Sequence, residues 1–194
     1  KGYSRRAHHA GSWYSDEETI LDGTLSRYLA AASNDDAQRA TSRTTGSAES
    51  SALRAIICPH AGFSYSGPTA AYGYSHLEQE LSKKDSPIRH IVVFHPSHHV
   101  YLDGCAVSGA HTIETPLGNL PVDSELRDEI LNLASKGGRS ALGFSVMDRD
   151  TDEEEHSGEM QYPFIAKIQK AACQKNGKTS MVPVLPIMCG AISD

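Results

Sequence analysis

Helical spacing of apolar positions and capping signals together predict four helices. The expected ranges are about 15–32, 68 onward, 123 onward and 157–173. In the first helix, apolar residues recur at intervals of three and four, which is typical of an amphipathic helix. The second begins at Pro68 because proline suits a first helical turn, and Asp123 can cap the third.

Short apolar runs predict strands between these helices. The expected ranges are 53–58, 90–94, 104–108, 144–147 and 181–189. Strands that alternate with helices predict an α/β fold with a central, mostly parallel sheet flanked by helices. Because 194 residues suit one hydrophobic core, we expect a single domain over residues 1–194.

The segment 33–51 interrupts this pattern. It is rich in Ser, Thr, Ala and Asp and has no apolar period, so we interpret it as a long polar loop inserted in the domain. The chain begins with Lys1 and stops at Asp194, shortly after the apolar run 181–189. Such runs are usually internal strands, and we therefore expect a fragment that is truncated at its C-terminus.

Composition excludes some classes of partner. The net charge of −6 argues against nucleic acid, which selects basic surfaces. No run reaches the roughly 18 apolar residues that membrane insertion requires. The polar start lacks the apolar core of a signal peptide, and the four cysteines form no C-x-x-C pair. These features favour a reducing, cytoplasmic location.

Two histidines follow predicted strands at the edge of the sheet where α/β proteins bind ligands. His60 comes after the run 53–58, and His98 comes after the run 90–94. Neutral imidazole is a common metal ligand and a usual general base near neutral pH. We predict that the two side chains share one ligand. The alternative is that each is a loop residue bonded to the backbone.

Three further aromatic side chains bear on this pair. Trp13 follows a glycine that could turn it towards a cleft, although a role in the core is slightly favoured. We expect His99 to support the pair or to lie exposed, and His95 to be structural. No residue is assigned as catalytic.

The acidic run 148–155 ends in a possible support for the pocket. We expect its first half to be a solvated loop. At its end, we expect His156 and Glu159 to support the pocket without binding the ligand themselves: Ser157 could cap the next helix, and Glu159 could satisfy free N–H groups or orient a histidine. Cys58 precedes a proline and is interpreted as a buried, inert thiol.

Six short motifs, taken in order, resemble the MEMO family over nearly the whole chain. They are HAGSWY (9–14), PHAG (59–62), PSHH (96–99), TPLG (115–118), DEEEHSGE (152–159) and VPVL (182–185). Each motif is weak alone, but the ordered set is highly specific.

This resemblance implies a fold similar to the class III extradiol ring-cleaving dioxygenases. Those enzymes hold iron with two histidines and a carboxylate. In MEMO-like proteins the corresponding pocket uses two histidines and a cysteine, and binding of iron or copper has been proposed. The histidines map onto His60 and His98, and Trp13 maps onto a tryptophan at the pocket mouth. Animal members are linked to receptor signalling, cell motility and binding of phosphotyrosine peptides in this pocket.

The chain departs from the family pattern in three places. Family members continue past the VPVL strand into a Ser-Ser-Asp motif, a further histidine and the third ligand, so the resemblance puts that ligand beyond Asp194. His95 stands where glycine is typical, and the segment 33–51 is longer than usual.

These features favour a MEMO-like protein with a vestigial dioxygenase-type pocket. We expect it to bind a metal ion or an anionic peptide such as one with phosphotyrosine, in a signalling or redox role in cell motility. The main alternative is an active non-haem metal-dependent oxidoreductase that acts on a small aromatic. A zinc hydrolase that uses the same histidines is a weaker third.

Overall fold

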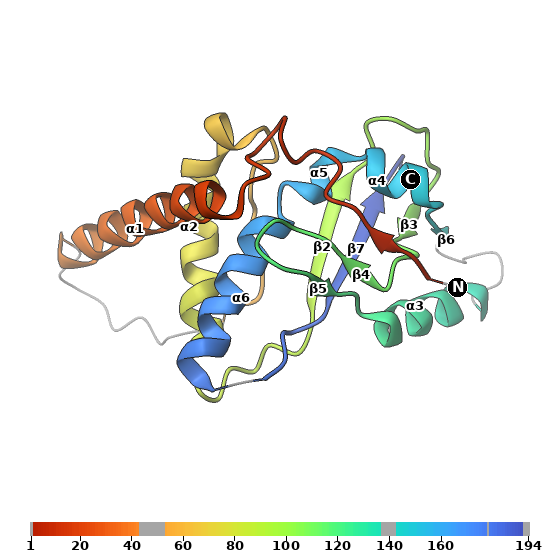
Figure 1. Cartoon of the computed structure of the whole chain (residues 1–194). Coiled ribbons are helices and arrows are strands. Elements are labelled where there is room, and N and C mark those ends of the chain that lie inside the picture. The colour runs from red at the N-terminus through yellow and green to blue at the C-terminus, as the bar shows by residue number, and fades with distance from the viewer. Residues whose placement is uncertain (1, 43–52, 137–142, 178, 192–194) are drawn as a thin grey trace.

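A computed structural model describes residues 2–42, 53–136, 143–177 and 179–191 of the chain (Figure 1). The helices are α1 (Glu18–Ser42), α2 (Phe63–Leu81), α3 (Ser124–Lys136), α4 (Arg149–Glu154), α5 (His156–Glu159) and α6 (Tyr162–Asn176). The strands are β1 (Ser4–Arg5), β2 (Ile91–Pro96), β3 (Cys105–Val107), β4 (Thr112–Ile113), β5 (Leu120–Pro121), β6 (Phe144–Val146) and β7 (Val184–Cys189).

Four of these strands form the main sheet, in the order β2-β7-β3-β6. Their positions confirm four of the five predicted strands, with bounds shifted by a few residues. The sheet is mixed, because β2/β7 and β3/β6 run parallel whereas β3/β7 run antiparallel. A small second sheet joins β1, β4 and β5. The α/β class is therefore confirmed, with a mixed main sheet.

The predicted strand at 53–58 is wrong. Within the described residues, this segment joins no strand ladder and runs as irregular chain. A cavity of about 400 Å³ is lined both by this segment and by β2, the edge strand of the main sheet. The two segments face the same cavity without pairing, so His60 follows an unpaired segment rather than a strand.

The predicted loop at 33–51 is wrong in its first part. Helix α1 continues to Ser42, and residues 43–52 lie outside the described residues. Alanine has the highest helix propensity, so the run from Ala30 to Ala32, with alanines at 37 and 40, continues the helix without an apolar stripe.

Two other helix boundaries also differ from prediction. Helix α2 begins at Phe63, whose N–H donates to the carbonyl of Trp13, so Pro68 lies inside the helix rather than at its start. The expected helix at 157–173 is divided into α5 and α6. Proline has no backbone N–H to donate inside a helix, but the first helical residues need none. Pro163 therefore suits the start of α6, where it lies.

Three of the helices form one layer, and α3 packs separately against β3 and β7 of the main sheet. Figure 1 shows α1 and α2 side by side, with α6 next to α2, and these three pack against one another. Leu21 and Leu25 of α1, Phe164 of α6 and Val184 of β7 belong to one buried cluster. None of the helices in the described part of the chain is both long and apolar enough to cross a membrane.

Candidate functional site: a histidine cluster beside the main sheet

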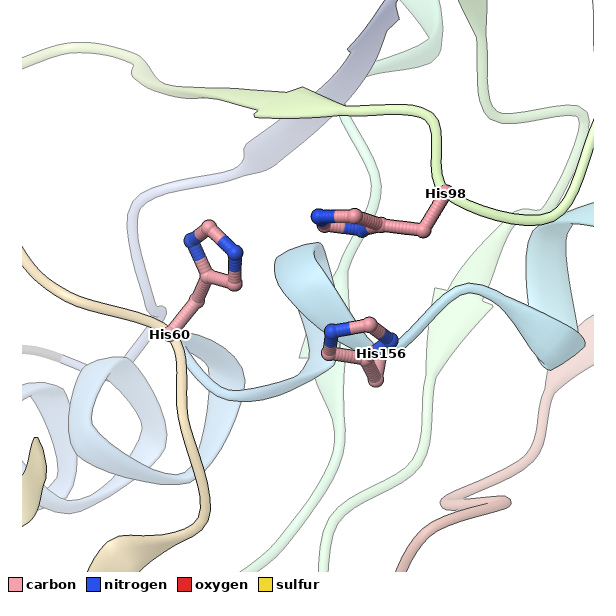
Figure 2. A group of neighbouring side chains, drawn as sticks. All are labelled: His60, His98 and His156. Carbon is pink, nitrogen blue, oxygen red and sulfur yellow. The ribbon is translucent and has the colours of Figure 1, made fainter. Parts of the chain in front are cut away.

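Three histidines from distant parts of the chain face one another, as Figure 2 shows. His60 lies in the irregular segment before α2, His98 in the turn after β2, and His156 at the first residue of α5. Contact between α5 and β2 brings His156 to the end of the strand that carries His98. The main sheet and α5 together therefore position the cluster.

The three rings are close enough to share a ligand. The ring centroids of His60 and His98 are 5.1 Å apart, and those of His98 and His156 are stacked at 4.6 Å. One nitrogen from each ring lies within 4.8 Å of the other two. The expected proximity of His60 and His98 is confirmed, whereas His156, expected only as a support, is a full member of the cluster.

Glu155 orients His98. Its carboxylate accepts a hydrogen bond from the backbone N–H of His98 at 2.6 Å and lies 2.9 Å from Nδ1 of the same residue. A carboxylate accepts hydrogen bonds, so this contact places the proton on Nδ1 and leaves Nε2 free to bind a ligand. The side chain of Glu155 also accepts from the N–H of Ser157. Glu155 therefore caps α5 in place of Ser157, the cap expected from the sequence.

The cluster combines neutral imidazoles with a charged carboxylate. Burial lowers the pKa of His60 and of His156, and the neighbouring His98 adds to the effect at both. Burial would raise the pKa of Glu155, but hydrogen bonds from His98 and Ser157 outweigh it and hold the pKa at about 2. The two imidazoles therefore keep the lone pairs that a metal ion requires.

The donor set fits a transition metal such as iron, copper or zinc. Two nitrogens each about 2.1 Å from one ion are at most about 4.2 Å apart, so the rings need only a small closing movement. A second group, formed by His99, Glu155 and His156, also brings possible ligand atoms within 4.8 Å. Since Glu155 is already held by His98, the group His60, His98 and His156 fits better.

Trp13 lies beside the cluster, so the slightly favoured prediction that it belongs to the core is wrong. Its ring centroid is 4.4 Å from that of His156, with 30° between the ring planes, and the residue is 36% exposed. The exposed His99 meets His156 edge-on at 5.8 Å. Both side chains border the same ring, where a bound ligand could contact them.

Glu159 accepts from a backbone N–H and contacts a histidine ring, the two roles expected for it, and the histidine is His9. Its carboxylate accepts from the backbone N–H of His9 at 2.7 Å and lies 3.1 Å from Nδ1 of that ring. Tyr14 donates to the same carboxylate. His9 in turn meets Trp13 edge-on at 5.7 Å. Glu159 therefore contacts Trp13 only through His9, and it supports the segment that carries Trp13 next to the three histidines.

His95 lies under the cluster and is structural, as expected. It is only 4% exposed, and its Nδ1 is 3.0 Å from the hydroxyl of Ser157. That hydroxyl donates to the carbonyl of Pro96, so it accepts from Nδ1–H of His95. Nε2 has no hydrogen-bond partner among the described residues, and burial lowers the pKa of His95 to about 4. The ring is therefore neutral.

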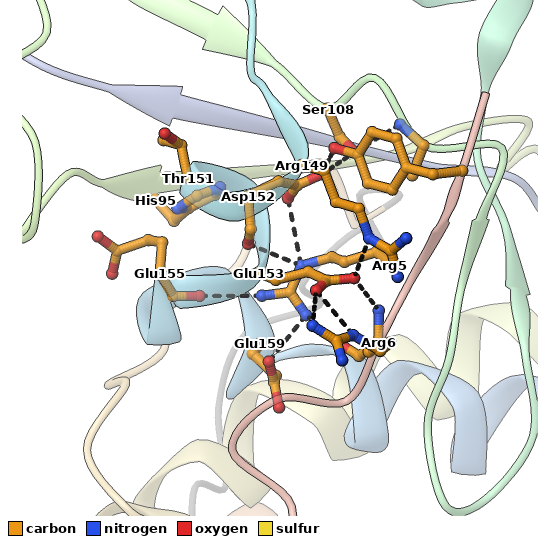
Figure 3. Close-up of polar contacts among 12 residues, drawn as sticks. Arg5, Arg6, His95, Ser108, Arg149, Thr151, Asp152, Glu153, Glu155 and Glu159 are labelled. Carbon is orange, nitrogen blue, oxygen red and sulfur yellow. Dashed lines mark hydrogen bonds and ion pairs between the residues drawn. The ribbon is translucent and has the colours of Figure 1, made fainter. Parts of the chain in front are cut away.

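A buried ion network holds α4 and α5 in place (Figure 3). The Arg5 guanidinium lies 2.8 Å from a carboxylate oxygen of Glu159 and 3.2 Å from one of Asp152. It also donates to the backbone carbonyl of Glu155 at 3.0 Å. Arg5 is 1% exposed, and Asp152 and Glu153, in the second half of the acidic run, are buried. The first half of the run is largely exposed, as expected, but it begins helix α4 rather than a loop.

Acidification below about pH 4.5 is expected to destabilise the fold through Glu159 and Glu153. Burial would raise both pKa values. The hydrogen bond with His9 and the charge of Arg5 nevertheless hold the pKa of Glu159 at about 2. Hydrogen bonds from Arg6 hold the pKa of Glu153 at about 2. Both folded pKa values lie below the ordinary 4.5. The stability that these two carboxylates give to the fold is therefore fully present above pH 4.5 and is lost as the pH falls towards 2.

Urea unfolding midpoints measured between pH 6 and pH 3 test this expectation. The midpoint should be level down to about pH 4.5 and then fall steeply. A Glu153→Gln variant, which has one such carboxyl fewer, should show a shallower fall. Equal slopes for the variant and the parent chain would show that Glu153 carries no such linkage.

Comparison with known proteins identifies the family. A family profile described as Memo-like protein matches residues 5–193. The chain is 38% identical over 183 residues to "Protein memo-1 homolog" of Caenorhabditis elegans, covering 94% of this chain and 43% of the relative. It is 33% identical over 190 residues to "Protein MEMO1" of Homo sapiens, covering 98% of this chain and 52% of the relative.

A yeast relative gives the same result. "MEMO1 family protein MHO1" of Saccharomyces cerevisiae is 38% identical over 167 residues, which are 86% of this chain and 44% of the relative. The chain thus spans about half the length of these curated relatives. The family profile covers almost every residue, and the histidine cluster lies inside the matched range. The chain therefore belongs to the MEMO family.

Proposed function

We propose that this chain is a metal-binding MEMO-family protein whose site is formed by His60, His98 and His156. The observation that carries the proposal is the contact between Glu155 and His98. A carboxylate that fixes the tautomer of a histidine, with the free nitrogen turned towards other imidazoles, is the usual arrangement behind a metal ligand. A histidine with a purely structural role does not need two imidazoles beside its free nitrogen.

Iron and copper suit three imidazoles, and zinc does so as well. A bound iron or copper ion would supply redox and Lewis-acid chemistry at this site. The chain's own residues would hold and orient it: Glu155 positions His98, and Trp13 packs on His156. The structure offers His156 as a third ligand beside His60 and His98.

A phosphotyrosine-containing peptide is the partner that we propose for this pocket. Trp13, exposed beside His156, offers an aromatic face for a tyrosine ring. Without a metal ion, however, the pocket combines neutral imidazoles with the charged Glu155, and its charge opposes a phosphate group. A bound cation would offset this charge, so we expect peptide binding to require metal.

Peptide binding can be measured with one tyrosine peptide in phosphorylated and unphosphorylated forms. We expect the phosphorylated peptide to bind only when metal has been added. Equal binding of the two peptides, or phosphopeptide binding that is unchanged by a chelator, would contradict this role. A signalling role in cell motility would rest on such binding.

An oxidoreductase that acts on a small aromatic is the second candidate. The observation that favours it is the cavity of about 400 Å³, which His60 lines together with apolar residues of β2 such as Val93. Cavities of this size suit small molecules. Oxygen uptake by the iron-loaded chain in the presence of a catechol would favour this candidate. Metal binding without turnover would favour the binding function.

Metal titration of the 194-residue chain tests the main proposal. Calorimetry with Fe(II), Cu(II) and Zn(II), followed by metal analysis of the desalted protein, is expected to give one ion per chain. Zinc occupancy together with hydrolase activity would instead support a hydrolase. Absence of binding for all three ions at millimolar concentration would overturn the proposal.

A Glu155→Gln substitution is expected to weaken metal binding about 10- to 100-fold, the usual effect of losing the partner behind a metal-binding histidine. The amide can accept only one of the two His98 contacts, so the ring loses its fixed tautomer. Calorimetric titration measures the change. Glu154→Gln is the matched control, since Glu154 is exposed and loses the same charge. Equal affinities in both variants would show that Glu155 does not orient a ligand.

A further inference from the structure

Two cysteines face each other across neighbouring strands of the main sheet. Cys105 is the first residue of β3, Cys189 is the last of β7, and the antiparallel register places them directly opposite each other. Their sulfur atoms are 3.9 Å apart, and both residues are free thiols at the border between core and surface. Nothing in the proposed metal site uses this pair.

The backbone pattern shows which kind of cross-strand pair this is. The N–H of Cys105 donates to Gly143, on the side of β6, and so turns away from β7. The ladder bonds between β3 and β7 flank the pair, from Gly190 to Gly104 on one side and from Ser108 to Pro186 on the other. Cys105 and Cys189 therefore form a non-hydrogen-bonded pair.

This geometry allows a disulfide without movement of the strands. In a non-hydrogen-bonded antiparallel pair the Cα atoms lie about 4.5 Å apart, and disulfides span Cα distances of about 4.4–6.8 Å. Rotation of the side chains then has to bring the sulfurs from 3.9 Å to bonding distance. Since the Cα distance lies at the short end of the range, the bridge would carry strain, and strained bridges are the ones that reduce readily.

We propose that Cys105 and Cys189 form a redox-modification site, which a hydroperoxide converts into a cross-strand disulfide and which a dithiol reductant converts back. One thiolate attacks the O–O bond, an S–O bond forms, and water or an alcohol leaves. The second thiol then attacks the sulfenic sulfur, the S–S bond forms, and water leaves. In total, two thiols lose two protons and two electrons, and the hydroperoxide is reduced to alcohol and water.

The rate of this reaction depends on thiolate. Burial raises the pKa of Cys189 to about 11, and the facing Cys105 adds to the effect. Thiolate is the reactive form, so oxidation should accelerate as the pH rises from 7 towards 9. The pair is thus slow to react at neutral pH and responds to sustained rather than brief exposure to peroxide.

The bridge would join β3 to the strand end that supports the histidine cluster. Cys189 is opposite Pro96 in the ladder between β7 and β2, and the N–H of Ser97 donates to the carbonyl of Cys189 at 3.1 Å. His98 is the next residue. A bond at Cys189 therefore restrains the turn that carries His98, whatever ligand this histidine binds.

The test is oxidation of the 194-residue chain with hydrogen peroxide at pH 8. We expect the number of titratable thiols to fall from four to two, the intact mass to fall by about 2 Da as two hydrogens are lost, and dithiothreitol to reverse both changes. Non-reducing peptide mapping should find one cross-link, between Cys105 and Cys189.

Single serine variants give the controls. Cys105→Ser and Cys189→Ser should each lose the intramolecular cross-link, whereas Cys58→Ser and Cys173→Ser should keep it. The proposal is overturned if the treated chain keeps four thiols, if other cysteines are joined, or if the mass rises by oxygen addition without a cross-link. These readouts need no bound metal, so they stand or fall independently of the proposed function.

Discussion

A His60→Ala chain should bind Fe(II), Cu(II) or Zn(II) at least about 100-fold more weakly than the parent chain. Loss of the residue that hydrogen-bonds a metal-binding histidine lowers metal affinity about 10- to 100-fold, and loss of the histidine itself should lower it further. His60 supplies one of the three nitrogens that lie within 4.8 Å of one another. Calorimetric titration at pH 7.5 measures the loss.

The same substitution should change stability little. His60 is only partly buried, and it lies in an irregular segment rather than in a helix or strand. The thermal midpoint without metal should therefore stay within a few degrees of the parent value. A large drop in the midpoint with metal affinity intact would show that His60 is a structural loop residue.

His99→Ala is the matched control for His60→Ala. His99 is exposed and belongs only to the alternative group with Glu155 and His156, whereas His60 belongs only to the preferred group. Strong loss in His60→Ala with little loss in His99→Ala selects the preferred group. The reverse result would assign the metal to His99, Glu155 and His156.

An Arg5→Met chain should be less stable by about 3–5 kcal/mol, the cost of removing one partner from a buried ion pair. The substitution leaves Glu159 and Asp152 buried without their guanidinium. It also removes the donor to the carbonyl of Glu155, which fixes α4 and α5 relative to β1. Urea unfolding measures the difference as a lower midpoint.

Arg6→Met is the matched control for Arg5→Met. The Arg6 side chain is 60% exposed, and its partner Glu153 also receives a hydrogen bond from Arg149, so we expect a much smaller change. If Arg5→Met does not fold, Arg5→Lys tests the same point, because lysine keeps the charge but not the forked donor geometry. Parent-like stability of Arg5→Lys would contradict a role for that geometry.

Local signals in the sequence predicted most of the main sheet and the position of α3. The strand prediction at 90–94 succeeded because Ile91 and Val93 are buried in the core and the segment pairs with β7 along its length. The similar run at 53–58 failed because a strand also needs a neighbour, and a cavity occupies that place. The acidic run 148–155 was predicted in part: its first half is exposed but helical, and Asp152 and Glu153 in its second half are buried against arginines near the N-terminus.

The site was predicted in part for the same reason. His60 and His98 were identified because each follows an apolar run and precedes a turn. His156 was expected only as a support because it directly follows an acidic run, whose ordinary environment is solvent. The one available signal was its position in the DEEEHSGE motif, directly after Glu155. Its role became visible only when α5 was seen against β2.

The sequence by itself determined the α/β class, most strands, the MEMO family and two of the three clustered histidines. These follow from the spacing of apolar residues and the order of short motifs, which are properties of neighbouring residues. The tertiary structure alone decided the third histidine, the exposure of Trp13 and the burial of Arg5 against Glu159, 154 residues away. Such contacts depend on how distant segments pack, and local spacing carries no record of that packing.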